Sequence, residues 1–199
     1  MANEKRIISF RDPHMALLIG DLATGTTYEK PIKIGRGIKG KISPKFAAET
    51  FRSDDEVEEQ VEQFQQVDVE LEVNALALEN YALVRGLTVV KGEIQDNGND
   101  RCPELAFGFR AKKTDGTYRY VWLLRGKFEC PDEEYETLKD KPEGKTITLK
   151  GTFYCRKSDN LWRLKGDESS GMQKTRIDGW FTSVAEPLPA VTPPATPPV

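Results

Sequence analysis

The chain offers few residue patterns that could support catalysis. His14 is its only histidine, whereas acid–base dyads, serine triads and common metal sites place a histidine beside a partner of matching type. No such partner is apparent around His14, and the motifs Gly-x-Ser-x-Gly, His-Glu-x-x-His and Ser-x-x-Lys are absent from the sequence. We therefore expect a non-catalytic histidine and no enzyme activity.

A glycine motif over residues 35–40 matches Gly-x-Gly-x-x-Gly letter for letter. In a dinucleotide-binding fold, such glycines admit a pyrophosphate to the N-terminus of the next helix. Here the sequence continues as alternating apolar and polar residues through Pro44, which is the pattern of a strand. The motif therefore predicts a glycine-rich bend at the start of a strand, and we expect no nucleotide cofactor.

The cysteines do not form a recognisable framework. Cys102, Cys130 and Cys155 are odd in number and lack Cys-x-x-Cys spacing, so neither a disulfide scaffold nor a zinc site is indicated. The N-terminus is polar, and no stretch approaches the roughly 20 apolar residues of a membrane-spanning helix. We expect reduced cysteines, no metal, no membrane association and folding in a cytoplasm.

Charge is abundant but nearly balanced, with 29 Lys and Arg against 32 Asp and Glu. A protein that grips DNA phosphates usually carries a basic excess or patch, so tight nucleic-acid binding is disfavoured. One run is strongly acidic and contains no base: Asp54, Asp55, Glu56, Glu58, Glu59 and Glu62. Such a run is usually a solvated loop, and it lacks the central glycine of a calcium loop. The functional alternative is an arm that reaches a basic surface on a neighbouring molecule.

Two segments alternate with the period of a strand that buries one face. In residues 38–46 the polar positions include Lys39, Lys41 and Lys45, and in residues 67–73 they are Asp68, Glu70 and Glu72. If these strands pair in one sheet or meet across subunits, opposite charges alternate along one wall and favour one register. The alternative is two unrelated solvated faces.

The remaining elements are also mostly strands. Asn74 is a candidate N-cap for a helix of about ten residues that ends at Gly86. Residues 105–113 and 117–128 flank an Asp-Gly turn and predict a hairpin, and residues 146–156 and 161–165 predict another. The expected fold is mainly β, an antiparallel sandwich or distorted barrel with one flanking helix.

The domain boundaries are set by composition. We expect one domain over residues 1–187, with an N-terminal arm at about 1–13 and a long loop at about 47–63. Residues 188–199 are uncharged and contain five prolines, which predicts an extended tail that does not pack in the core.

The order of these segments resembles the major tail proteins of bacteriophages with long, non-contractile tails. The resemblance covers roughly residues 16–187. It lies in seven segments: 16–21, 28–34, 67–73, 76–86, 103–109, 113–118 and 180–187. Residues 3–12 and the proline-rich end are less typical of the family. The resemblance implies a tail-tube fold, with two packed antiparallel sheets and a flanking helix.

The resemblance also implies a structural function in the virion, after assembly in the host cytoplasm. Subunits of that family form six-membered rings that stack into a tube, which holds a tape-measure protein and later conducts double-stranded DNA. Tail terminator and distal tail proteins are the other partners implied. The lumen should avoid a continuous basic stripe because phosphate contacts would slow DNA, so our candidates are Asp68, Glu70 and Glu72. The candidates for contacts between rings are Thr50, Phe51, Arg52, Asp54, Asp55, Glu56, Glu58 and Glu59.

Two other classes remain open at this level. Tyr118, Tyr120 and Trp122 alternate on one strand, as a base-stacking face would in an OB-type barrel that binds nucleic acid. Packing in a core explains the same pattern. A small-ligand barrel or an enzyme on a β scaffold would instead require a pocket with perturbed ionisable groups.

Overall fold

The structure is a computed structural model that describes residues 5–53, 56–137 and 144–189, with only the backbone described at 49–53 and 56–60. The described chain is mainly β, with two short α-helices and one 3₁₀ turn. The strands are β1 (Ile7–Leu22), β2 (Gly25–Tyr28), β3 (Ile32–Lys33), β4 (Gly37–Ser53), β5 (Glu56–Val73), β6 (Leu105–Lys113), β7 (Tyr118–Phe128), β8 (Ile147–Tyr154) and β9 (Arg163–Asp167). The helices are α1 (Leu78–Arg85), η1 (Glu168–Ser170) and α2 (Lys174–Gly179).

All nine strands belong to one antiparallel sheet with the order β2-β1-β6-β7-β8-β5-β4, and β3 and β9 pair with β1 and β7. The mainly β, antiparallel prediction is confirmed. The expected pair of separate sheets is wrong, because the hydrogen-bonded ladder is continuous. The sheet curls so that β1 approaches β4 without pairing, and it does not close into a barrel.

The glycine motif lies where β1 and β4 approach each other. A Cβ atom added at Gly37 would lie 2.2 Å from Cε1 of Phe10, and one at Gly40 would lie 2.8 Å from its Cε2. The Phe10 ring of β1 therefore occupies the space that side chains on β4 would need. Both glycines lie within β4, where the chain continues as a strand rather than a helix, so the motif serves sheet packing and lacks the setting of a dinucleotide site.

Two apolar clusters lie on the two faces of the sheet. The inner cluster gathers fully buried side chains from several strands and α1, among them Met15, Leu71, Val84, Phe107 and Phe153. The outer cluster includes Trp122 on β7, and it is covered by Trp180, Val184 and Ala185 from the segment after α2. Helix α2, which precedes this covering segment, is a second α-helix that the sequence pattern did not predict.

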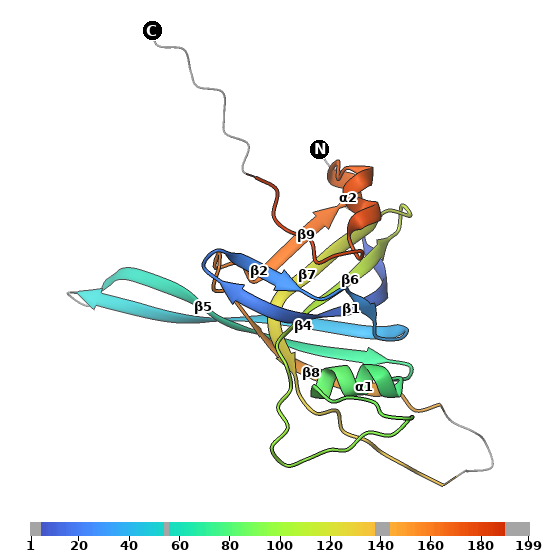
Figure 1. The fold of residues 1–199 in the computed structure, drawn as a ribbon. Helices are drawn as coiled ribbons and strands as arrows, with labels where there is room; N and C mark the ends of the chain where they lie inside the picture. Colours follow the sequence, from blue (N-terminus) through green and yellow to red (C-terminus); the bar gives the residue numbers. More distant parts are fainter. Residues whose placement is uncertain (1–4, 54–55, 138–143, 190–199) are drawn as a thin grey trace.

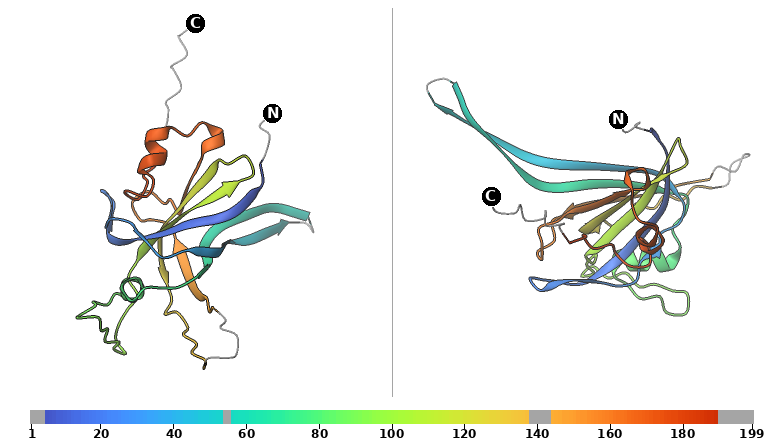
Figure 2. Two further views of the ribbon diagram at one scale, coloured as in Figure 1. Left: turned by 90° about the vertical axis from the view of Figure 1, so that its right-hand side faces the viewer. Right: turned by 90° about the horizontal axis from the view of Figure 1, so that it is seen from above.

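Residues 47–63 are not a loop where the structure describes them. The ladder between β4 and β5 continues from Gly37↔Val73 to Ser53↔Glu56, whereas β8 pairs with β5 only from Val67 to Val73. Beyond that point the two strands form a two-stranded hairpin that extends well away from the rest of the sheet (Figures 1 and 2). We call residues 45–53 and 56–66 the arm. The loop prediction failed because consecutive like charges hide the period of two that marks a strand.

Two smaller predictions also change. The described part of the proposed N-terminal arm belongs to β1, since Ile7 pairs with Lys113 and Phe10 with Ala111. Helix α1 begins after Ala77 rather than Asn74, and the Asn74 Oδ1 instead accepts a hydrogen bond from the Arg36 backbone N–H at 2.9 Å. Gly86 does end the helix, with φ of 73°.

One of the two expected hairpins is confirmed. Strands β6 and β7 pair across the turn at Gly116, whose φ is 88°. The other is wrong, because β9 pairs with the first half of β7 whereas β8 pairs with its second half. Sequence proximity does not decide this choice, because β7 offers both partners the same open edge. Among the described helices, none is long and apolar enough to cross a membrane.

Candidate functional site

The two charge stripes predicted from the sequence meet on one face of the sheet. Lys39 lies opposite Glu72 and Lys41 opposite Glu70 in the β4–β5 ladder. Directly opposed residues of antiparallel strands project to the same face, so these residues form adjacent rungs of opposite charge. The prediction that the stripes share a sheet face is confirmed, and the alternative of two unrelated faces is excluded.

A direct ion pair runs diagonally between the next two rungs, because Asp68 lies opposite Ser43 and Lys45 lies opposite Gln66. The Lys45 Nζ contacts Asp68 Oδ2, and the Gln66 side-chain amide donates to Asp68 Oδ1 at 2.8 Å. The hydrogen bond from Lys45, and then that from Gln66, lowers the pKa of Asp68 below its usual value. Both charged side chains remain partly exposed, at 53% for Lys45 and 39% for Asp68, so solvent screens the pair.

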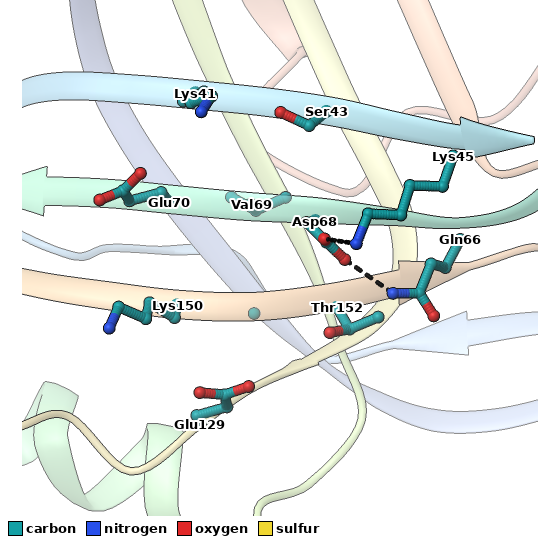
Figure 3. Close-up of a pocket in the computed structure, with 11 residues that line it drawn as sticks. Lys41, Ser43, Lys45, Gln66, Asp68, Val69, Glu70, Glu129, Lys150 and Thr152 are labelled. Carbon is teal, nitrogen blue, oxygen red and sulfur yellow. Dashed lines mark hydrogen bonds and ion pairs between the residues drawn. The ribbon is translucent and has the colours of Figure 1, made fainter.

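Strand β8 extends the pattern to a third strand. Lys150 lies opposite Glu70, and Thr152 lies opposite Asp68. Figure 3 shows these side chains with Lys41, Ser43 and Glu129 along a shallow hollow across β4, β5 and β8. We call this surface the charged face; its members are Lys39, Lys41, Ser43, Lys45, Asp68, Glu70, Glu72, Glu129, Lys150 and Thr152.

Lys150 and Glu129 were not predicted from the sequence. The alternation along β8 marks Lys150 as an outward-facing residue, because it lies between the inward-facing Leu149 and Gly151. What the sequence lacked was the pairing of β8 with β5. Glu129 reaches the same surface because its backbone N–H donates to the Lys150 carbonyl at 2.8 Å, just after β7 ends.

The charged face is poorly suited to tight binding of DNA phosphates. Lys39, Lys41 and Lys150 each lie opposite a carboxylate on β5, and Lys45 pairs diagonally with Asp68. A phosphate that approaches one of these lysines therefore also meets an acid. Binding that releases counterions from DNA requires cations that are free to contact phosphates. In the described chain, no cluster of three or more His, Cys, Asp and Glu side chains is arranged to hold a metal ion.

The lumen candidates Asp68, Glu70 and Glu72 thus lie together on this face. The ring-contact candidates Thr50, Phe51, Arg52, Glu56 and Glu59 lie on the backbone of the arm, where Phe51 pairs with Glu59. Glu58 lies in β5 at an irregularity of the ladder. Asp54 and Asp55 lie outside the described residues. Strands β4 and β5 therefore carry the lumen candidates and also those ring-contact candidates that the structure describes.

The aromatic alternation on β7 is covered by the chain itself. Tyr120 is 2% exposed and Trp122 fully buried, beneath Trp180 and Phe181. The Trp122 indole N–H donates to the Trp180 carbonyl at 3.0 Å. A stacking platform must present open ring faces to bases, so this strand does not supply the OB-type site that its aromatic alternation suggested.

His14 lies beside the same covering segment. Its ring stacks on Phe181 with 4.3 Å between centroids, and its Nδ1 lies 2.8 Å from the Asp12 carbonyl oxygen. Burial lowers the pKa of His14 below its usual value. Its contacts are those of a packing residue.

No family model matches the chain, and no curated protein matches its sequence. Any functional assignment therefore rests on the geometry of the described residues and on the sequence itself.

The Lys45–Asp68 pair gives a direct test of the charged face. Because Lys45 holds the pKa of Asp68 down, the pair contributes stability above the usual aspartate pKa and loses it as pH falls through the lowered value. We expect Lys45→Ala to raise the pKa of Asp68 toward 3.8, measured by NMR titration of the side-chain carboxyl. Stability should change by less than about 1 kcal/mol, as for other exposed pairs. An unchanged Asp68 titration in Lys45→Ala would show that the pair does not form in solution.

Proposed function

We propose that this chain is the tube subunit of a long, non-contractile bacteriophage tail, which assembles into stacked six-membered rings around a channel for double-stranded DNA. The observation that carries the proposal is the arm. Its strands pair only with each other beyond Val67, and an isolated two-stranded hairpin is marginally stable in water. A neighbouring subunit would supply the surface against which such a hairpin becomes stable.

The edges of the sheet support assembly into a closed ring. Strand β4 ends the sheet on one side and β2 ends it on the other, so both edges retain unpaired backbone groups. Open edges invite pairing with another chain, and repeated contact between two different patches closes a ring when the rotation is right. Pro44 on β4 lacks a donor N–H, which is tolerated at such an edge.

The charged face supports the channel. It lies on β4, β5 and β8, so rings joined through the sheet edges would present it repeatedly around the axis. Its alternating lysines and carboxylates would hold water while offering phosphates no continuous cationic track. In this proposal the tape-measure protein occupies the channel before the DNA, the terminator and distal tail proteins close the tube, and no catalysis or cofactor is involved.

Assembly of the purified full-length chain tests this proposal. We expect sedimentation velocity to show rising high-mass species as concentration increases, and negative-stain microscopy to show tubes of uniform width with a central channel. Discrete rings without stacking would support the ring contact alone. A chain that remains monomeric up to millimolar concentration would count against the whole proposal.

A further inference from the structure

A second surface, on β7 and β9, carries three cations, and among the described residues only Arg119 has an acidic partner. Arg119, Lys165 and Arg163 share one face, because Arg119 lies opposite Asp167, and Lys165 and Arg163 lie opposite Val121 and Leu123 on the same side of β7. Within the part of the chain that the structure describes, neither Arg163 nor Lys165 forms a salt bridge. Arg119 contacts Asp167 at 2.9 Å, but Lys113 also contacts that carboxylate.

These cations lie close together where an anion could reach them, since Lys165 is exposed and Arg163 is half-buried. Burial lowers the pKa of Arg163. Burial, and then the positive charges of Arg163 and Arg119, lower the pKa of Lys165. Placing cations beside like charges is unfavourable unless an anion compensates. A carboxylate-bearing partner would supply that compensation.

Aromatic rings continue this surface toward the base of the arm. The Arg163 guanidinium lies 4.0 Å from the centroid of the Trp162 ring, and Trp162 stacks on Phe64 with centroids 5.1 Å apart. Phe46 packs edge-on against Phe64 at 5.7 Å and is 53% exposed. Exposed aromatics beside arginine are typical anchors of protein interfaces. We call Phe46, Phe64, Arg119, Trp162, Arg163 and Lys165 the basic–aromatic surface.

Charge complementarity selects one occupant for this surface. Residues 49–62 contain seven acids and one base, Arg52, and those that the structure describes form the outer part of the arm. The arm leads away from the body of its own molecule (Figure 2), so this acidic segment is within reach of other copies. We infer that the basic–aromatic surface receives the acidic arm of a second copy of this chain. The inference rests on the proposed function, since it names the surface that the arm contacts in the tube.

A charge swap in the full-length chain tests the docking. Arg163→Glu with Lys165→Glu should raise the concentration at which assembly begins at least about tenfold, because close like charges oppose association. Glu58→Lys with Glu59→Lys should do the same. Combining all four changes should restore assembly to within about threefold of the original protein, since each surface again meets its opposite charge. Sedimentation velocity measures the onset, and microscopy identifies the product.

Controls separate docking from total charge and from folding. Lys30→Glu with Lys91→Glu gives the same net charge change at exposed positions outside the surface and should leave the onset within about threefold. Circular dichroism melting should show a folded monomer for each variant. If the glutamate pair prevents folding, Arg163→Gln with Lys165→Gln removes the charge without adding a new one and should still weaken assembly.

The outcomes distinguish the docking from the tube. Tubes that form normally from the Arg163→Glu, Lys165→Glu variant would overturn the docking while leaving the tube function intact. A salt-sensitive dimer lost in that variant, without tubes in the original protein, would support the docking and contradict the tube. If the variant assembles normally but no longer binds a 30-base-pair DNA duplex that the original protein binds, the surface contacts DNA and the docking is wrong.

Discussion

Replacing residues 50–60 with Asn-Gly is expected to abolish tube formation while leaving the monomer folded. Glu49 and Val61 are directly opposite in the ladder, so two residues can close the shortened hairpin, and Asn-Gly favours the required turn. The buried part of β5 begins only at Val67. We expect the onset of assembly to rise more than about a hundredfold, which corresponds to roughly 3 kcal/mol of association free energy. Sedimentation velocity and negative-stain microscopy provide the measurements.

A deletion of residues 190–199 serves as the control of similar size. That segment lies outside the described residues, and its uncharged, proline-rich sequence predicts no role in the core. Tubes should form from this control as from the original chain. Normal tubes from the shortened-arm variant would remove the arm from the assembly contacts, even if the chain is a tube protein.

Trp180→Ala should lower the stability of the folded chain more than most single substitutions outside the inner cluster. Trp180 is 2% exposed and lies 5.7 Å from Tyr120 between ring centroids. Its removal leaves a cavity over the outer face of the sheet, and truncating such a large buried side chain typically costs about 3–5 kcal/mol. For a chain of this length, the melting temperature should fall by roughly 6–20 °C. Thermal and denaturant unfolding of the full-length chain measure the change.

Leu188→Ala is the matched control in the same C-terminal stretch. Leu188 is 71% exposed, so the change should stay within about 0.5 kcal/mol. Trp180→Ala with a loss below about 1 kcal/mol would mean that the segment after α2 does not cover the sheet in solution. Equal losses in both variants would point to a general sensitivity of the C-terminus rather than to the packing of Trp180.

The charged face shows which features of the fold a local sequence pattern predicts and which it does not. A period of two is a property of each strand alone, since successive side chains project to opposite faces. The sequence therefore identified Asp68, Glu70 and Glu72, and the three lysines of β4, as polar positions on strands. It left open whether the two stripes meet, and it did not mark Lys150 as part of the same face. The ladder decided both points, because strand pairing joins residues that are distant in the chain.

The arm and the basic–aromatic surface depended still more on tertiary structure. The acidic run carries no clear alternation, so cross-strand pairing alone makes residues 56–62 a strand. Likewise, Arg163 and Lys165 are ordinary alternating residues until β9 pairs with β7 and brings them beside Arg119. Local sterics set most of the strands, the turn at Gly116 and the helix end at Gly86, all of which the sequence determined. The choice of partner strand depends on long-range burial and hydrogen bonding, and only the folded chain decided it.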